Sequence, residues 1–356
     1  MSKNKPLFQE FPTITLQEWE EKIIKDLKGK PLSALENNTQ EGISYFPHFT
    51  KENSSDYYLE NSDSKRKPSS EENNWNTDVA IKVKDSKIAN TFALNSLKNG
   101  VNSLTFKGDL SEISVLLDNI MIEIVSINFI TRDPKNTISQ LKEICNNRDL
   151  NLNVLKGSIT YDFLTDFAKN KKPSSFNSIG FENLNSLVNE IKESKFEAIA
   201  IGTCMYQKAG ANITQQIAIG LSKGVEYLNN LTENNSIDDL ANKVTFHFNI
   251  GNDYFMEIAK IRAFRLLWSQ VLTSFGAKNT KTTISATTSS LLWAEKDMKN
   301  NMLRATSQAM SAVIGGCDSL NILPFDTINE TTKSYSKRVA SNVHHILKEE
   351  SYLDKV

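Results

Sequence analysis

The sequence predicts an α/β fold of the (β/α)8 TIM-type barrel class, preceded by a helical arm at the N-terminus. Three observations lead to this prediction. Strand-like and helix-like patterns alternate from about residue 86 to residue 350 with short connections, which is typical of a parallel sheet. Seven strand and helix units can be traced in one direction, which favours a barrel over an open sheet. No Gly-x-Gly-x-x-Gly follows a strand, which argues against a dinucleotide-binding fold.

Residues 1–76 are interpreted as an arm followed by a polar linker, and residues 77–356 as the barrel. Thr15 and Glu18 form a capping-box pattern, so a helix should run from about Leu16 to Leu27. The apolar residues of the arm need a partner surface, which is either this chain's own barrel or another subunit. The pattern does not separate these two readings. Residues 51–76 are nearly all polar and therefore predict a loop or linker.

The barrel pattern is clearest between residues 244 and 326. Val244-Thr-Phe-His-Phe-Asn-Ile250 has the pattern of a buried strand, and the stretch from Tyr254 to Trp268 that of a helix covered on several sides. Gly315-Gly316 ends the next helix, because glycine tolerates the positive φ of a helix C-terminus. Strands are predicted at residues 101–106, 121–126, 150–155, 198–203, 244–250, 283–288 and 319–324. Helices are predicted at residues 86–98, 111–117, 137–146, 161–168, 183–193, 214–230, 254–268, 298–313 and 337–350.

The eighth strand is the weak point of the barrel prediction. After the helix at residues 337–350 only residues 351–356 remain, which suffice at most for the start of a strand. A barrel that is one strand short would leave a gap between the strands at 101–106 and 319–324. Both strands would then present unpaired backbone groups, and the chain would tend to self-associate.

Composition excludes several classes of function. A formal net charge of -1 gives no long-range attraction to nucleic acid or to anionic lipid. No apolar run approaches the roughly 20 residues that span a bilayer, and the N-terminus lacks an apolar secretory segment. Cys145, Cys204 and Cys317 are too scattered for a disulfide framework or a zinc site, so we expect reduced thiols in a cytoplasmic protein.

The predicted strand ends offer few groups for acid–base chemistry. His247 is the one histidine among them, and it lies in the middle of a strand between two phenylalanines, where a hydrogen-bonded core residue is the commoner role. His344 and His345 are adjacent on a helix and face different ways, so they lack the spacing of metal ligands. We therefore expect no metal site and no catalytic residue from these patterns.

Two long motifs resemble the methylmalonyl-CoA mutase family. They are Phe255-Met-Glu-Ile-Ala-Lys-Ile-Arg-Ala-Phe-Arg-Leu-Leu-Trp268 and Asn301-Met-Leu-Arg-Ala-Thr-Ser-Gln-Ala-Met-Ser-Ala-Val-Ile-Gly-Gly316, followed by Leu323-Pro-Phe-Asp326. Trp19-Glu-Glu-Lys-Ile-Ile-Lys-Asp-Leu-Lys-Gly29 resembles the arm of the same family. The resemblance covers most of the chain and is weakest at residues 51–193.

The resemblance implies a cofactor, a substrate class and a partner. The family uses adenosylcobalamin to interconvert methylmalonyl-CoA and succinyl-CoA by radicals, with the CoA thioester threaded along the barrel axis. Its corrin is held by a histidine in an Asp-x-His-x-x-Gly motif, which this chain lacks. The family's Asp-Pro-x-x-Gly-Ser segment, which would complete the barrel, is also missing here. Adenosylcobalamin is therefore expected in an assembled enzyme, bound by a large catalytic subunit of methylmalonyl-CoA mutase, and not by this chain.

The barrel-mouth positions depart from the catalytic pattern of the family. Residues 74–82 lack the tyrosine and arginines of Arg-Pro-Trp-Thr-x-Arg-Gln-Tyr, and this segment is expected to precede the first barrel strand. Methionine stands at the family's histidine and can neither donate a proton nor hydrogen-bond strongly. Lysine at the arginine of Arg-x-Ser keeps the charge but not the bidentate fork. The degenerate substrate-binding positions are Thr160, Asn170, Met205, Gln207, Lys243 and Thr245.

These losses together favour the small, non-catalytic subunit of a heterodimeric mutase, which supports the large subunit. Two other readings remain open. One is a divergent acyl-CoA mutase barrel that works with a separate cobalamin-binding protein, and the other is a module that binds a CoA thioester without turnover.

Overall fold

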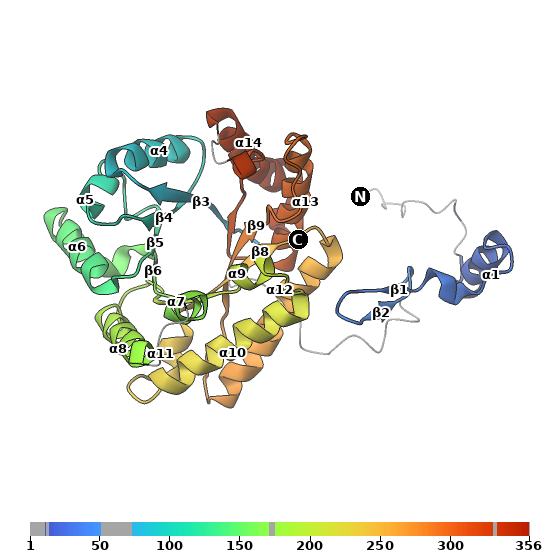
Figure 1. Cartoon of the computed structure of the whole chain (residues 1–356), viewed down its shortest axis with the longest axis horizontal. Coiled ribbons are helices and arrows are strands. Elements are labelled where there is room, and N and C mark those ends of the chain that lie inside the picture. Colours follow the sequence, from blue (N-terminus) through green and yellow to red (C-terminus); the bar gives the residue numbers. More distant parts are fainter. Residues whose placement is uncertain (1–10, 12–13, 51–72, 171–174, 330–332, 356) are drawn as a thin grey trace, which may run out of the picture. The chain divides into compact units, whose positions relative to one another are not determined.

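The computed structural model describes residues 11, 14–50, 73–170, 175–329 and 333–355. The side chains of residues 170 and 175–178 lie outside this description. The chain divides into two compact units, residues 1–62 and residues 63–356, and each is treated by itself (Figure 1).

The N-terminal unit consists of a helix and a short hairpin. Helix α1 (Leu16–Asp26) begins at the Thr15–Glu18 capping box, so the predicted helix is confirmed. Strands β1 (Asn37–Asn38) and β2 (Ser44–Tyr45) pair antiparallel. Trp19 stacks on His48 with ring centroids 4.4 Å apart, yet none of the residues of α1 is buried. Among the described residues of this unit, the exposed apolar side chains in the isolated chain include Phe11, Ile14, Ile24, Ile43, Tyr45, Phe46 and Phe49.

The second unit is an eight-stranded parallel barrel within the described residues, so the predicted fold class is confirmed. The strands lie in the order β6-β5-β4-β3-β10-β9-β8-β7, and a parallel bridge between Ser158 and Glu197 links the two ends of this series. Their bounds are β3 (Asn76–Val83), β4 (Ser103–Gly108), β5 (Ser126–Ile130), β6 (Lys156–Thr160), β7 (Ile199–Gly202), β8 (Val244–Ile250), β9 (Thr283–Thr288) and β10 (Ser319–Asn321).

Strand β3 fills the gap that the sequence predicted. It pairs parallel with β4 on one side and with β10 on the other, so the prediction of two unpaired strand edges is wrong. The segment that was predicted to precede the first barrel strand therefore contains that strand. Residues 353–355, where a partial strand was expected, form a 3-10 helix instead.

Two predicted strands lie too early in the chain. Residues 121–125 and 150–155 contain no strand, and the strands that follow them are β5 and β6. The cause is the polarity of the true strands. Ser126-Ile-Asn-Phe-Ile130 alternates polar and apolar side chains, whereas the prediction followed the apolar residues just before it, such as Ile122 and Val125, which are buried outside any strand.

Helices surround the strands, as Figure 1 shows for the barrel unit. Asp85 caps α4 and Asp133 caps α6 through their carboxylates, and Gly316 ends α13 with φ 87°. The helices of the described barrel unit are α4 (Ser86–Lys98), α5 (Ile113–Leu116), α6 (Pro134–Asn147), α7 (Phe163–Asn170), α8 (Ser175–Glu190), α9 (Cys204–Lys208), α10 (Ile213–Leu231), α11 (Ile237–Ala241), α12 (Tyr254–Ser274), α13 (Asn300–Gly315) and α14 (Ser334–His345).

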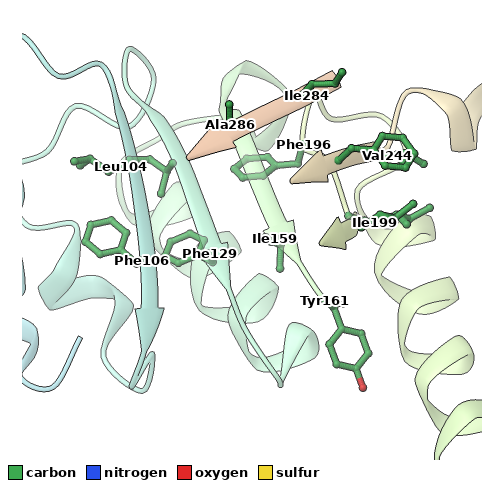
Figure 2. Packing of buried hydrophobic residues seen from close by; sticks show 14 of the residues in the cluster. Leu104, Phe106, Phe129, Ile159, Tyr161, Phe196, Ile199, Val244, Ile284 and Ala286 are labelled. Atoms are coloured by element: carbon green, nitrogen blue, oxygen red, sulfur yellow. The ribbon is translucent and has the colours of Figure 1, made fainter. Parts of the chain in front are cut away.

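The apolar core lies between the strands and the surrounding helices. Leu104, Phe106 and Phe129 belong to it, and Figure 2 shows them with other members of the cluster. On the other side of the barrel the rings of Phe246 and Trp268 meet edge to face, 4.8 Å apart. No helix in the described part of the chain combines the length and apolar character needed to cross a bilayer.

Candidate functional site

The interior of the barrel is polar, unlike the packed apolar interior that this fold usually has. Strand residues alternate, so the side chains next to the apolar core residues point inward. A cavity of about 160 Å³ lies inside the ring of strands. Its lining is made mostly of hydroxyl, amide and charged side chains, which include Ser103, Thr105, Ser126, Asn128, Ser158, Thr160, Glu197, Thr245, His247, Thr283, Ser285 and Asp318.

Three titratable groups of this interior have strongly shifted pKa values. Burial raises the pKa of Asp78 to about 6, although its carboxylate accepts hydrogen bonds from Ser103 and Thr105. Burial also raises the pKa of Glu197 to about 7. Burial lowers the pKa of His247 to about 4, and its Nε2 atom has no hydrogen-bond partner. Near pH 7 the interior therefore carries less charge than its residue types imply.

Two of the sequence-predicted positions line this cavity. Thr160 ends β6 and donates its hydroxyl hydrogen bond to the carbonyl oxygen of Phe129, 2.9 Å away. Thr245 lies near the start of β8 and donates its hydroxyl hydrogen bond to the Glu197 carboxyl. Both hydroxyls are therefore occupied by the protein's own groups.

Two further predicted positions lie on α9, the short helix that follows β7. In Figure 1 this helix projects over the middle of the ring of helices. Gln207 is buried, accepts a hydrogen bond from Ser289 Oγ at 2.9 Å and donates one to the Asn249 carbonyl at 3.5 Å. Met205, on the same helix, is half-buried. The amide of Gln207 thus ties α9 to the ends of β8 and β9.

The remaining two predicted positions do not join this group. Lys243 lies just before β8, at the opposite end of the barrel from α9, where its ammonium donates hydrogen bonds to the carbonyls of Ile191, Ser194 and Phe196. Burial lowers the pKa of this lysine. Asn170 ends α7, and its side chain lies outside the described residues. The structure therefore places Thr160 and Thr245 in the cavity, Met205 and Gln207 on α9, and the ammonium of Lys243 outside both sets.

Sequence reasoning missed the charged groups of the barrel axis. Asp78 and Lys82 were assigned to a segment before the first barrel strand, and Lys107 and Lys208 were not singled out. The two-residue alternation of the strands is the signal that identifies the charged groups on β3 and β4. Lys107 follows Thr105 by two residues, and Lys82 follows Asp78 by four, so both lie on the inward face.

The histidines do not fit the axial ligand of a corrin, which needs a free imidazole nitrogen on a surface wide enough for a macrocycle. His247 faces a cavity of about 160 Å³, and His344 accepts the indole N–H of Trp75 at 3.1 Å. His345 contacts the Asn99 carbonyl, and His48 stacks on Trp19. No group of three or more His, Cys, Asp or Glu in the described residues could hold a metal ion.

Comparison with known proteins gives a consistent result. The family model described as methylmalonyl-CoA mutase matches residues 73–356. The methylmalonyl-CoA mutase small subunit of Porphyromonas gingivalis is 32% identical over 377 residues, covering 100% of this chain and 60% of that protein. The large subunit of the same organism is 36% identical over 165 residues, covering 45% of this chain and 23% of that protein.

Other relatives match a shorter part of the chain. The methylmalonyl-CoA mutase of Escherichia coli is 38% identical over 163 residues, covering 45% of this chain and 23% of its own length. The chain thus spans 60% or less of the length of these relatives. The wild-type HPPK-DHPS of Plasmodium falciparum resembles the chain weakly, with a TM-score of 0.43 and 12% identity over 79% of this chain and 49% of that one.

Proposed function

This chain belongs to the methylmalonyl-CoA mutase family, and we propose that it is the small, non-catalytic subunit of the adenosylcobalamin-dependent enzyme. In this role it supports a large subunit that interconverts methylmalonyl-CoA and succinyl-CoA in the cytoplasm. The observation that carries the proposal is the extent of similarity. The small subunit of P. gingivalis matches along 100% of this chain, whereas the large subunit matches along 45%.

The chemistry of the barrel mouth supports a non-catalytic role. Met205 offers no proton and only a weak hydrogen-bond acceptor. Thr160 and Thr245 already direct their hydroxyls at protein acceptors. A ligand pocket commonly encloses roughly 300–1,000 Å³, and the cavity here measures about 160 Å³. A CoA thioester would have to widen the ring of strands to occupy it.

The N-terminal unit supports a role in assembly. Phe11, Phe46 and Phe49 are exposed by 66%, 46% and 56% in the isolated chain. Burying such side chains against a second protein contributes about 1.5–3 kcal/mol each. We assign the large subunit as that partner, and adenosylcobalamin to the large subunit, because the histidines of this chain do not fit a corrin. The CoA thioester would then bind in the complex and not in this barrel.

Co-expression with a large subunit of the family tests the proposal. We expect the two chains to co-purify, no mutase turnover from this chain alone above the adenosylcobalamin blank, and turnover from the complex. Turnover by this chain with a separate cobalamin-binding protein would favour a divergent catalytic barrel. Saturable binding of a CoA thioester by the isolated chain, without co-purification of a large subunit, would favour a binding module. Either result would overturn the proposal.

A further inference from the structure

Three lysines meet at the mouth of the barrel, on the side where α9 lies. Lys82 and Lys107 are direct register partners on the adjacent parallel strands β3 and β4. Both lie on the inward face by strand alternation, and both are exposed. Lys208, also exposed, ends α9. The pKa of Lys107 is lowered first by burial around its ammonium group and then by the charges of Lys208 and Lys82, so both of these lysines lie within electrostatic reach of Lys107.

The charge of the buried Asp78 carboxylate partly offsets that of Lys107, so the three ammonium groups together keep a net positive charge. No hydrogen bond or ion pair joins any of the three to another described group. The carboxylates of the neighbouring segments accept hydrogen bonds from groups other than these lysines. Asp85 accepts the Ile88 N–H at 2.9 Å, Asp109 accepts the Ser111 N–H at 3.0 Å, and Asp78 accepts hydrogen bonds from Ser103 and Thr105.

The backbones of the two strand lysines are also fixed relative to each other. Gly108 follows Lys107 with φ +119°, and a Cβ at this glycine would lie 2.4 Å from the Val83 carbonyl oxygen. The Asp109 N–H donates to the same oxygen at 3.1 Å. Like charges on paired strands are destabilising, and here the backbone prevents the strands from moving apart. Such an arrangement is stabilised when an anion lies between the charges.

We propose that Lys82, Lys107 and Lys208 form a binding site for the phosphate group of a small molecule at the mouth of the barrel. Lysine binds phosphate as a point charge, and three ammonium groups from different elements match a group with two negative charges. The site does not depend on the subunit role proposed above, because all three lysines belong to this chain.

Calorimetric titration of the full chain with orthophosphate at constant ionic strength tests the proposal. We expect saturable binding of one phosphate per chain, weakened about tenfold by each of Lys82→Gln, Lys107→Gln and Lys208→Gln, as the loss of a charge-assisted contact implies. Lys156→Gln is the matched control, because Lys156 is an exposed lysine on β6 that lines the barrel cavity but is not one of the three. This variant should bind phosphate as the wild type does.

Three outcomes would overturn the site. The first is the absence of saturable phosphate binding by the wild-type chain. The second is an equal loss of affinity in Lys156→Gln, which would indicate a general effect of net charge. The third is tighter binding of malonate than of orthophosphate or pyrophosphate, which would make the ligand a dicarboxylate. Co-purification with a large subunit is measured separately, so failure of the phosphate site leaves the subunit proposal standing, and the reverse also holds.

Discussion

Thr245 and Glu197 meet inside the barrel, where the threonine hydroxyl donates a hydrogen bond to the glutamate carboxyl. Glu197 also forms the backbone bridge to Ser158 that links the two ends of the strand series. The carboxyl therefore lies at the seam of the barrel, in a cavity whose burial raises its pKa to about 7. A group at this position couples the protonation of the interior to the stability of the closed ring.

We predict that Glu197→Gln raises the free energy of unfolding above pH 7. The folded pKa lies above the usual value of 4.5, so the folded state binds the proton more tightly. This contribution to stability is fully present below about pH 4.5 and is lost as pH rises to about 7. At about 1.4 kcal/mol per pKa unit, the loss in unfolding free energy caused by ionised Glu197 is on the order of 3 kcal/mol above about pH 7.

Urea denaturation at about pH 5 and about pH 8 measures this effect. Asp78 contributes in the same direction and His247 in the opposite direction, so the informative quantity is the difference between variant and wild type. Glu193→Gln, an exposed glutamate four residues earlier, is the control. Identical pH profiles for Glu197→Gln and the wild type would contradict a protonated Glu197.

We predict that Lys243→Met destabilises the fold. The Lys243 ammonium donates hydrogen bonds to the carbonyls of Ile191, Ser194 and Phe196. Methionine would remove this donor from all three, although Ile191 would keep the hydrogen bonds from the N–H and hydroxyl of Ser194. A loss of roughly 2–4 kcal/mol in unfolding free energy follows. Thermal or urea melts measure it. The exposed Lys195→Met should change stability little, and an equal loss in both variants would show that the carbonyl contacts do not matter.

We predict that Gly224→Ala is destabilising, although alanine is the better helix former. A Cβ at Gly224 of α10 would lie 2.4 Å from Cζ3 of the buried Trp268 ring. The helix propensity gain is about 1 kcal/mol, and forcing two packed helices apart costs about 1–3 kcal/mol. Ser222→Ala is the control, because Ser222 is exposed on the same helix. This substitution raises helix propensity without creating a steric clash. If Gly224→Ala unfolds at a midpoint temperature equal to or above that of the wild type, α10 and α12 can move apart at little cost.

We predict that the double variant Phe46→Ser and Phe49→Ser assembles poorly while its isolated barrel stays intact. Both rings are exposed in the isolated chain, so its unfolding free energy should change by no more than about 0.5 kcal/mol. If both rings are buried against a large subunit, affinity should fall by at least about tenfold. Pull-down with a tagged large subunit measures this. Ile88→Ser, exposed on the barrel unit, is the control, and unchanged capture of the double variant would exclude these rings from the interface.

The sequence predicted the class of fold well because helices and short connections leave a strong periodic signal. The capping box at Thr15 and Glu18 and the glycine at the end of α13 placed one end of each of these two helices to within a few residues. Strands were predicted correctly where they are apolar, as in β8. They were misplaced where the inward side chains are serine, asparagine or lysine, because a polar interior removes the apolar run that marks a buried strand. Strand β3, which contains Asp78 and Lys82, was missed for the same reason.

The candidate site was less predictable than the fold. Thr160 and Thr245 were placed together by family resemblance, and both line the cavity. Lys243 was grouped with them because its type matches the family pattern, but its side chain turns to the carbonyls that follow α8. The direction of a side chain one residue outside a strand depends on tertiary contacts that periodicity does not encode. The lysines on β3, β4 and α9 come together through strand register and a short helix, and neither was available from the sequence.

The position of β3 determines when the barrel can form. Its partners are β4, its sequence neighbour, and β10, which lies more than two hundred residues later in the chain. Trp75, just before β3, also donates to His344 near the end of the chain. During synthesis one edge of β3 therefore stays unpaired until β10 has left the ribosome. Folding of the ring should be a late event of high contact order, and a growing chain with that open edge is the species most exposed to aggregation.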